Sequence, residues 1–181
     1  MSTNQAVALS SKPLNIAVRP AREGDVPAIT EIYNQGIEDR IATLEGEPHS
    51  VEERLEWFRA HGPQEPVLVA EADGLIVGWA SLSCYKPRRC YDGVKELSIY
   101  VRREWRGRGV GARLLDALLK RGAEVGVHKV VLYAFPSNAR ALALYRKAGF
   151  RAVGIYRHHG LLDGQWKDII AMELDLAGDQ P

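Results

Sequence analysis

The sequence has few cysteines, no long apolar run and almost no net charge. Cys84 and Cys90 are its two cysteines, and their spacing fits neither a disulfide scaffold nor a Cys-x-x-Cys pair. We therefore expect free thiols in a reducing compartment. No apolar run is long enough to span a membrane, and the N-terminus lacks the charged-then-apolar order of a signal peptide. The five histidines show no metal-ligand spacing. We expect a cytoplasmic protein and assign no metal.

The formal net charge of +1 argues against general nucleic-acid binding. The charges are nevertheless uneven. Basic residues gather in one region of the sequence: Lys86, Arg88, Arg89, Arg102, Arg103, Arg106, Arg108 and Arg113. Such a cluster is either a solvated surface or the contact surface of a polyanionic ligand, and both interpretations stay open here.

The composition is typical of one globular domain. The chain has 181 residues, of which 46% are hydrophobic and 26% are charged, enough for a sizeable core. Polar and small residues dominate residues 1–13, which we expect to be a disordered arm. Residues 177–181 are expected to be a tail, so the predicted domain spans residues 14–176.

Hydrophobic periodicity predicts strands and helices along this domain. Strands are expected at residues 15–19, 66–71, 75–82, 96–101, 129–135, 150–156 and 166–174. Expected helix N-caps are Asp25, Ser50, and either Ser137 or Asn138. Ser50 also forms a capping-box pattern with Glu53, Asp73-Gly74 predicts a hairpin turn, and Gly149 ends the last helix. The apolar run at residues 129–135 indicates a strand buried on both faces.

The most informative stretch runs from Glu96 to Leu119. Apolar residues alternate along residues 97–101, as in a half-buried strand, and recur at helical spacing along residues 110–118. A basic, glycine-rich turn, RREWRGRGVG, lies between them. Glycines without a Cβ let the backbone approach an anion, and the free N–H groups of the next helix suit phosphate oxygens.

Three glycine motifs compete for this turn. A P-loop requires Lys-Ser or Lys-Thr after its glycines, and neither is present. A dinucleotide fingerprint requires Gly-x-Gly-x-x-Gly, whereas the spacing here is Gly-x-Gly-x-Gly. Arg106, Gly109 and Gly111 fit a third motif, Arg-x-x-Gly-x-Gly. At this turn the sequence resembles the GCN5-related N-acetyltransferases, which hold the pyrophosphate of acetyl-coenzyme A (acetyl-CoA) with that loop.

The resemblance extends to the order of the expected elements, β-α-α-β-β-β-α-β-α-β-β, over about residues 15–175. It implies an α+β fold with a mostly antiparallel mixed sheet of about seven strands, flanked by about four helices. It also implies acetyl-CoA as co-substrate, with main-chain groups of Ile99, Tyr100 and Val101 at the thioester and pantetheine. The loop implied to hold the diphosphate comprises Arg106, Gly107, Arg108, Gly109, Val110, Gly111 and Ala112.

The implied reaction is attack of a primary amine on a thioester carbonyl. The protonated amine needs a base, the developing oxyanion needs a donor such as a backbone N–H, and the leaving thiolate benefits from an acid. On pattern alone, Glu96 would be an exposed glutamate at a strand end. The phosphinothricin acetyltransferases, a subfamily that the chain also resembles, place their proposed base at the matching position, which implies Glu96 as the base.

The segment ALYRKAGF is similar to the family's last-helix signature, in which Asn precedes Leu-Tyr-x-Lys-x-Gly-Phe. In that signature the Asn binds the pantetheine arm and the Tyr lies near the thiol. The resemblance therefore implies that Asn138 binds the cofactor and that Tyr145 is the acid. Spacing alone is equally consistent with Tyr145 as a core residue, and Asn138 is also a good N-cap.

The subfamily stretch Lys-x-Arg-x-x-Tyr, ahead of the glutamate, is matched by Lys86, Arg88 and Tyr91. These residues look like a set that recognises a carboxylate or phosphinate, since a guanidinium is a planar fork. The alternative is a solvated basic loop. Leu44 stands where the subfamily has an aromatic residue in the loop between the first two helices, and Asp163 stands where it has a histidine in the last hairpin. Both departures bear on the substrate rather than on acetyl chemistry.

We therefore predict an acetyl-CoA-dependent N-acetyltransferase that acts on phosphinothricin, methionine sulfoximine, methionine sulfone or an ordinary amino acid. Acetylation of a protein N-terminus or lysine is an alternative with the same chemistry. A CoA-binding regulatory domain without turnover is an alternative of another class. The subfamily also implies a homodimer.

His158 and His159 are further candidates for the site. Adjacent strand residues point to opposite faces, so at most one of the two would face the site.

Overall fold

The computed structural model describes residues 15–177, and its elements follow the predicted order. The predicted arm at residues 1–13 lies outside the described residues, as do residues 178–181 of the predicted tail. The strands are β1 (Ile16–Pro20), β2 (Val67–Ala72), β3 (Leu75–Cys84), β4 (Val94–Val101), β5 (Lys129–Ala134), β6 (Arg151–Leu162) and β7 (Gln165–Asp175). The α-helices are α1 (Val26–Glu38), α2 (Val51–Arg59), α3 (Val110–Glu124) and α4 (Ala139–Lys147).

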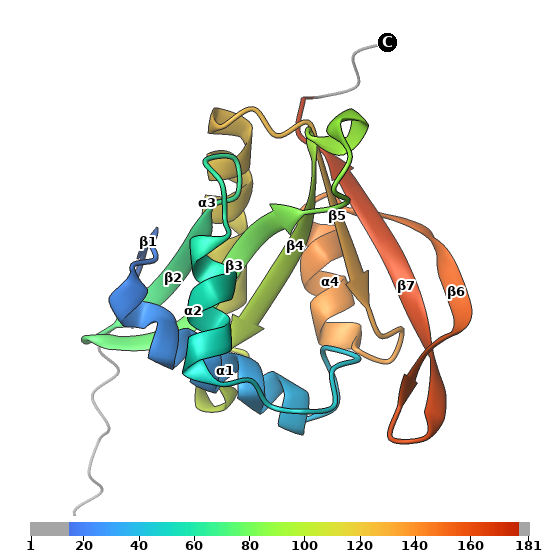
Figure 1. Cartoon of the computed structure of the whole chain (residues 1–181), viewed down its shortest axis with the longest axis horizontal. Coiled ribbons are helices and arrows are strands. Elements are labelled where there is room, and N and C mark those ends of the chain that lie inside the picture. Colours follow the sequence, from blue (N-terminus) through green and yellow to red (C-terminus); the bar gives the residue numbers. More distant parts are fainter. Residues whose placement is uncertain (1–14, 178–181) are drawn as a thin grey trace, which may run out of the picture.

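Within residues 15–177 the strands form one seven-stranded sheet in the order β1-β2-β3-β4-β5-β7-β6 (Figure 1). Neighbouring strands are antiparallel except β4 and β5, which run parallel. The mixed, mostly antiparallel sheet and its α-helices confirm the predicted fold class.

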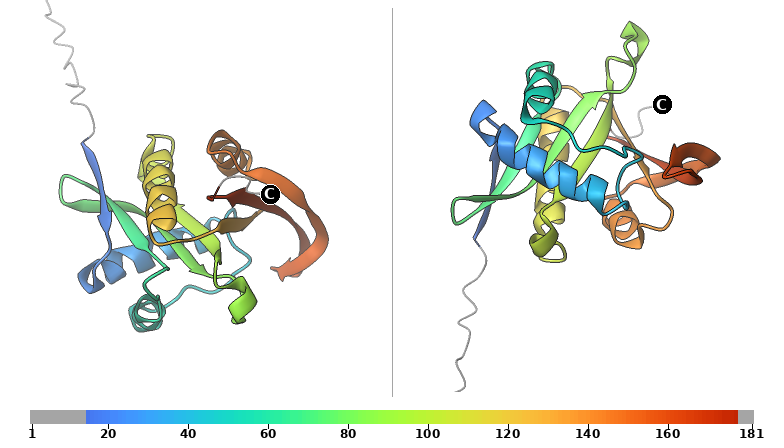
Figure 2. Two further views of the ribbon diagram at one scale, coloured as in Figure 1. Left: turned by 90° about the horizontal axis from the view of Figure 1, so that it is seen from above. Right: turned by 60° about the horizontal axis from the view of Figure 1, so that its bottom comes forward.

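The helices cover the two faces of the sheet in pairs, with α1 and α2 on one face and α3 and α4 on the other (Figure 2). The apolar core is divided in the same way. Leu114 and Leu118 of α3 are buried on one face, and Ile29 and Ile32 of α1 are buried on the other, against Trp79 of β3. Each such side chain contributes roughly 1.5–3 kcal/mol by leaving water, so apolar packing holds the sheet in place from both faces.

β4 and β5 pair only from Val94↔Lys129 to Glu96↔Val131 and then diverge (Figure 1). On their other edges both strands stay paired, β4 with β3 as far as Val101 and β5 with β7 as far as Ala134. The edge of β4 beyond Glu96 therefore borders a gap rather than a neighbouring strand.

β5 corrects one expectation, because its apolar run predicted burial on both faces. Val130, Leu132 and Ala134 are buried, but the alternate residues Val131 and Tyr133 are only half-buried. The side chain of Tyr133 borders the cavity described below. One face of the strand is therefore apolar without being covered by a helix.

The helix ends follow the predictions at most positions. Ser50 and Glu53 form the predicted capping box at the start of α2, and the Asn138 side chain caps α4. Asp25 does not cap α1 with its side chain, which instead accepts hydrogen bonds from Arg19. An ion pair with β1 has therefore replaced the predicted cap.

The remaining sequence expectations concern thiols and membranes. Cys84 and Cys90 are exposed free thiols. Among the helices of residues 15–177, none combines the length and the apolar character needed to cross a bilayer.

Ser50→Ala tests whether the capping box holds α2 in place. The variant should lose about 1 kcal/mol of unfolding free energy, because the N–H of Glu53 loses its acceptor. Chemical denaturation measures this loss. Ser137→Ala is the matched control, since Ser137 is exposed and the adjacent Asn138 provides the cap of α4. Equal stability of the two variants would contradict the role of Ser50.

Candidate active site

The gap between β4 and β5 opens into a cavity of about 960 Å³. Its walls come from both strands, the connection between α1 and α2, the glycine turn before α3, and α4. Small-molecule sites in proteins usually measure about 300–1,000 Å³. The cavity therefore has room for a large ligand or for two smaller ones.

The cavity joins both faces of the sheet at β4. Ile99 and Val101 face α3 and α4, where they lie beside Gly111. Tyr100 faces α1 and lies directly against Gly36. Glu96 shares the face of Tyr100, because it lies an even number of positions away along the strand. A ligand in the gap can therefore contact groups from both helical layers.

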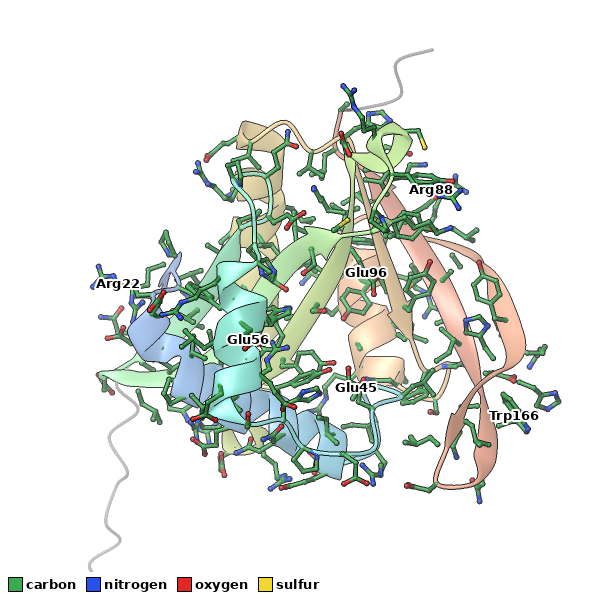
Figure 3. The ribbon with its side chains drawn as sticks, in the orientation of Figure 1. Arg22, Glu45, Glu56, Arg88, Glu96 and Trp166 are labelled. Carbon is green, nitrogen blue, oxygen red and sulfur yellow. The ribbon has the colours of Figure 1, made fainter. Side chains whose placement is uncertain are left out.

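Glu96 lies between the diverging strands, at the last position where β4 pairs with β5 (Figure 3). Its side chain is half-buried, and this burial raises the pKa of the carboxyl group above its ordinary value. Within residues 15–177, no ion pair or hydrogen bond to the carboxylate offsets the effect of burial. The oxygens of Glu96 are therefore available to a ligand, and the raised pKa makes the carboxylate a stronger base near neutral pH.

Tyr145 lines the same cavity from α4. It is buried and packs against the ring of Phe150, with 5.8 Å between ring centroids. Burial raises the pKa of its hydroxyl well above the ordinary tyrosine value. The hydroxyl therefore stays protonated at neutral pH and can donate a proton or a hydrogen bond. The structure thus brings both predicted catalytic residues to one cavity.

The glycine turn is left-handed at Gly107 and Gly109, with φ of +80° and +82°. Gly109 is the N-cap of α3, and apart from Gly109 and its two chain neighbours no atom of residues 15–177 lies within 4 Å of the position that its Cβ would occupy. A Cβ added at Gly107 would lie 3.6 Å from Nη1 of Arg140. The turn is therefore open above the helix N-terminus, and a cation from α4 stands beside it. Sequence reasoning missed Arg140, because only the fold brings α4 to this turn.

Part of the basic cluster is neutralised by acidic residues of α1 and the position after it. Arg102 forms an ion pair with Glu31, and Arg103 and Arg106 both pair with Asp39. Nε of Arg106 also donates to the carbonyl of Val101 at 3.0 Å. These side chains fasten the glycine turn to α1, so only part of the cluster is available to a polyanion.

Asn138 connects two walls of the cavity. Its Oδ1 accepts from the N–H of Ala141 at 3.2 Å, and its Nδ2 donates to the carbonyl of Ile41 at 3.1 Å. Leu44 lies on the same connection between α1 and α2, and its side chain packs against Gly160 of β6. Both residues line the cavity.

Lys86, Arg88 and Tyr91 lie on the connection between β3 and β4 and do not line this cavity. Arg88 is exposed above the strands (Figure 3). The ammonium of Lys86 lies 5.4 Å from the ring centroid of Tyr91. Among the described residues, these three side chains are therefore not part of the cavity wall that includes Glu96.

Two residues of the predicted cofactor loop also lie outside the cavity wall. The guanidinium of Arg108 lies over the ring of Trp105, 5.3 Å from its centroid. Val110 is buried in the core beneath the turn and anchors the start of α3. The other predicted cofactor residues line the cavity: Ile99, Tyr100, Val101, Arg106, Gly107, Gly109, Gly111, Ala112, Asn138 and Tyr145.

The last hairpin contributes His159 to the cavity, whereas His158 does not line it. The backbone N–H of His158 donates to Asp168, and Asp163 pairs with Arg40. Ser83 of β3 also lines the cavity and contacts His61, which follows α2. Sequence reasoning missed Ser83 and His61, because no local pattern links them.

Comparison with known proteins identifies relatives of the chain. Residues 28–150 match the sequence model of the Acetyltransferase (GNAT) family. The chain is 34% identical to the L-methionine sulfoximine/L-methionine sulfone acetyltransferase of Pseudomonas paraeruginosa over 165 residues, which cover 90% of this chain and 96% of that protein.

Solved structures of similar fold and sequence are also N-acetyltransferases. A ribosomal-protein-alanine N-acetyltransferase from Brucella melitensis is 34% identical, with a TM-score of 0.85, over 88% of this chain and 99% of that chain. A GNAT superfamily phosphinothricin acetyltransferase from Sinorhizobium meliloti, in complex with AcCoA, is 30% identical, with a TM-score of 0.85, over 90% of this chain and 89% of that chain.

Gly109→Ala tests the left-handed conformation of the turn. An alanine at φ of +82° should cost about 1–2 kcal/mol of unfolding free energy, because its Cβ meets the following carbonyl. Gly24→Ala is the control, since Gly24 has similar free space but is not among the glycines with positive φ. Denaturant titration of both variants should separate them, and equal stabilities would contradict the conformation described.

Proposed function

The chain belongs to the GNAT acetyltransferase family, and we propose that it transfers the acetyl group of acetyl-CoA to the primary amine of a small amino acid-like substrate. One observation carries this proposal: a single cavity is lined by the glycine turn, by Glu96 and by Tyr145. The names of the relatives support the choice of substrate, since one acetylates methionine sulfoximine and methionine sulfone and another acetylates phosphinothricin.

The residues around the glycine turn suit acetyl-CoA, which supplies an activated acetyl thioester when bound. The loop from Arg106 to Ala112 would hold the diphosphate through main-chain N–H groups at the start of α3. The guanidinium of Arg140, beside Gly107, adds a positive charge to this site. Ile99, Tyr100 and Val101 would hold the pantetheine and thioester through their main chain, and Asn138 would contact the arm.

In the proposed reaction Glu96 removes a proton from the substrate ammonium, either directly or through a water. The free amine then attacks the thioester carbon and forms the C–N bond. As the C–S bond breaks, the protonated hydroxyl of Tyr145 donates a proton to the departing sulfur, and the nitrogen releases its second proton to water. Backbone N–H groups on the edge of β4 beyond Glu96 stabilise the negative charge that develops on the thioester oxygen. Tyr145→Phe should lower turnover, because the departing sulfur loses its proton donor, and unchanged turnover would remove this role.

We further propose that Lys86, Arg88, Tyr91 and Leu44 recognise the substrate. The basic side chains suit a carboxylate or phosphinate, and Leu44 supplies apolar surface inside the cavity. Because Lys86, Arg88 and Tyr91 do not line the cavity of one chain, a movement of their loop or a second subunit would complete the substrate site.

A homodimer is part of the proposal. The outermost strand β6 and the start of β7 expose apolar side chains. They include Val153, Ile155 and Leu161 of β6 and Trp166 of β7. A second copy of the chain would remove this surface from water. Light scattering should give the mass of a dimer at micromolar concentration, and a monomer mass would remove this part of the proposal.

A substrate panel tests the proposed function. With acetyl-CoA, we expect thiol release with methionine sulfone, phosphinothricin or a free amino acid, and little release with short peptides. The relative from Brucella melitensis makes an alanine-terminated peptide the second candidate substrate. Turnover of that peptide alone would favour protein acetylation. Acetyl-CoA binding without turnover of any amine would favour a regulatory domain.

Glu96→Gln tests the proposed base. Turnover should fall by about 10²–10⁴-fold, as expected for loss of a general base, while the Kd of acetyl-CoA stays unchanged. Glu56→Gln is the control, since Glu56 is exposed on α2, away from the gap (Figure 3). Near-normal turnover of Glu96→Gln would remove the assignment.

The pH profile of the wild type gives a second test. Its kcat/KM should fall as acid protonates Glu96, and the midpoint of this fall should lie above the ordinary glutamate pKa of about 4.3.

A further inference from the structure

We propose that Ser83 is a second acceptor for the ammonium group of the substrate and that it acts beside Glu96. His61 is the positioning residue, which holds the Ser83 hydroxyl in an accepting orientation. The inference rests on the proposed function and specifies how the reacting amine is bound before it loses its proton.

Ser83 and Glu96 are direct neighbours across the sheet. They are Cα partners in the antiparallel pairing of β3 with β4. Side chains of such partners point to the same face, with Cβ atoms about 4.5–5.5 Å apart. Both side chains line the cavity, on the face covered by α1 and α2. A primary ammonium group can therefore contact both at once.

The direction of the hydrogen bonds around His61 follows from its partners. Nδ1 of His61 lies 2.8 Å from the carbonyl oxygen of Trp57, and Nε2 lies 3.0 Å from Oγ of Ser83. Because a carbonyl oxygen can only accept, Nδ1 must carry the hydrogen. In the neutral imidazole Nε2 then has a lone pair, and the Ser83 hydroxyl must donate its hydrogen to it.

The surroundings of His61 keep the imidazole neutral. Burial lowers the pKa of His61 below its ordinary value and outweighs the hydrogen bond to the Trp57 carbonyl, which favours the protonated ring. Among its charged neighbours, Arg54 and Lys95 also disfavour the protonated ring, whereas Glu65 favours it. Glu65 is itself paired with Lys95 at 2.9 Å. The ring of His61 packs edge-on against Trp57, with centroids 4.4 Å apart, so its orientation is fixed as well.

The Ser83 hydroxyl can therefore only accept from a ligand. A serine hydroxyl has a single hydrogen, and here that hydrogen is directed at His61. Its lone pairs remain, on the same face of the sheet as the carboxylate of its cross-strand partner Glu96. An alkylammonium group has N–H donors and no acceptor, so the paired acceptors match it. They hold the amine while Glu96 takes its proton.

Ser83→Ala removes the acceptor and little volume. We expect the KM for the amine to rise about tenfold, as for the loss of a hydrogen bond to a charged group, with kcat changed less than about twofold. The Kd of acetyl-CoA should be unchanged, which also shows that the variant is folded. Ser81→Ala is the matched control, because Ser81 lies on the same face of β3 but outside the cavity. It removes a buried hydroxyl that has no hydrogen-bond partner among residues 15–177, and it should leave the KM unchanged.

His61→Phe separates positioning from structural support. Alone it should raise the KM about threefold, because the Ser83 hydroxyl becomes free to rotate. In the Ser83→Ala background it should add less than about twofold, since His61 then has no hydroxyl to orient. An equal effect in both backgrounds would overturn the role of His61. If His61→Phe does not fold, Ser83→Ala alone decides whether the hydroxyl binds the amine.

The inference and the proposed function fail in different ways. A wild-type KM in Ser83→Ala, together with wild-type turnover of an amine, overturns the inference alone. A wild-type protein that acetylates no amine in the panel overturns the proposed function and the inference with it.

Discussion

The short parallel pairing of β4 with β5 determines where ligands can bind. The two strands share hydrogen bonds only as far as Glu96 and Val131, while their outer edges stay paired with β3 and β7. The backbone groups of β4 beyond Glu96 therefore lack a neighbouring strand on one edge. Buried backbone N–H and C=O groups need partners, and an extended ligand with its own polar groups can supply them. The gap is thus a binding site made by the sheet itself.

This gap also explains why groups from opposite faces of the sheet can take part in one reaction. The glycine turn, Arg140 and Tyr145 belong to the layer of α3 and α4, whereas Glu96 and Ser83 face the layer of α1 and α2. In a continuous sheet the strands would separate these groups. Here a co-substrate bound on one side and an amine bound on the other can meet between the strands. The ion pairs of Asp39 with Arg103 and Arg106 fasten the two layers together at the end of the gap.

Much of the architecture could be predicted from the sequence, because periodicity, caps and turn residues act locally. The element order, the capping box at Ser50 and the Arg106–Gly111 motif were all readable in this way. The divergence of β4 and β5 could not be predicted, because an apolar strand has the same sequence pattern whether a helix or a cavity covers it. Ser83, His61 and Arg140 were missed for a related reason: their roles depend on contacts between distant segments. The resemblance, rather than any pattern, singled out Glu96 and Tyr145.

A crystal structure of the protein with coenzyme A and an N-acetylated amino acid examines this account most directly. The account predicts the diphosphate at the turn from Arg106 to Ala112, the sulfur between β4 and β5, and the amide nitrogen of the product beside Glu96 and Ser83. A coenzyme bound elsewhere, with the gap between the strands filled by side chains, would contradict it.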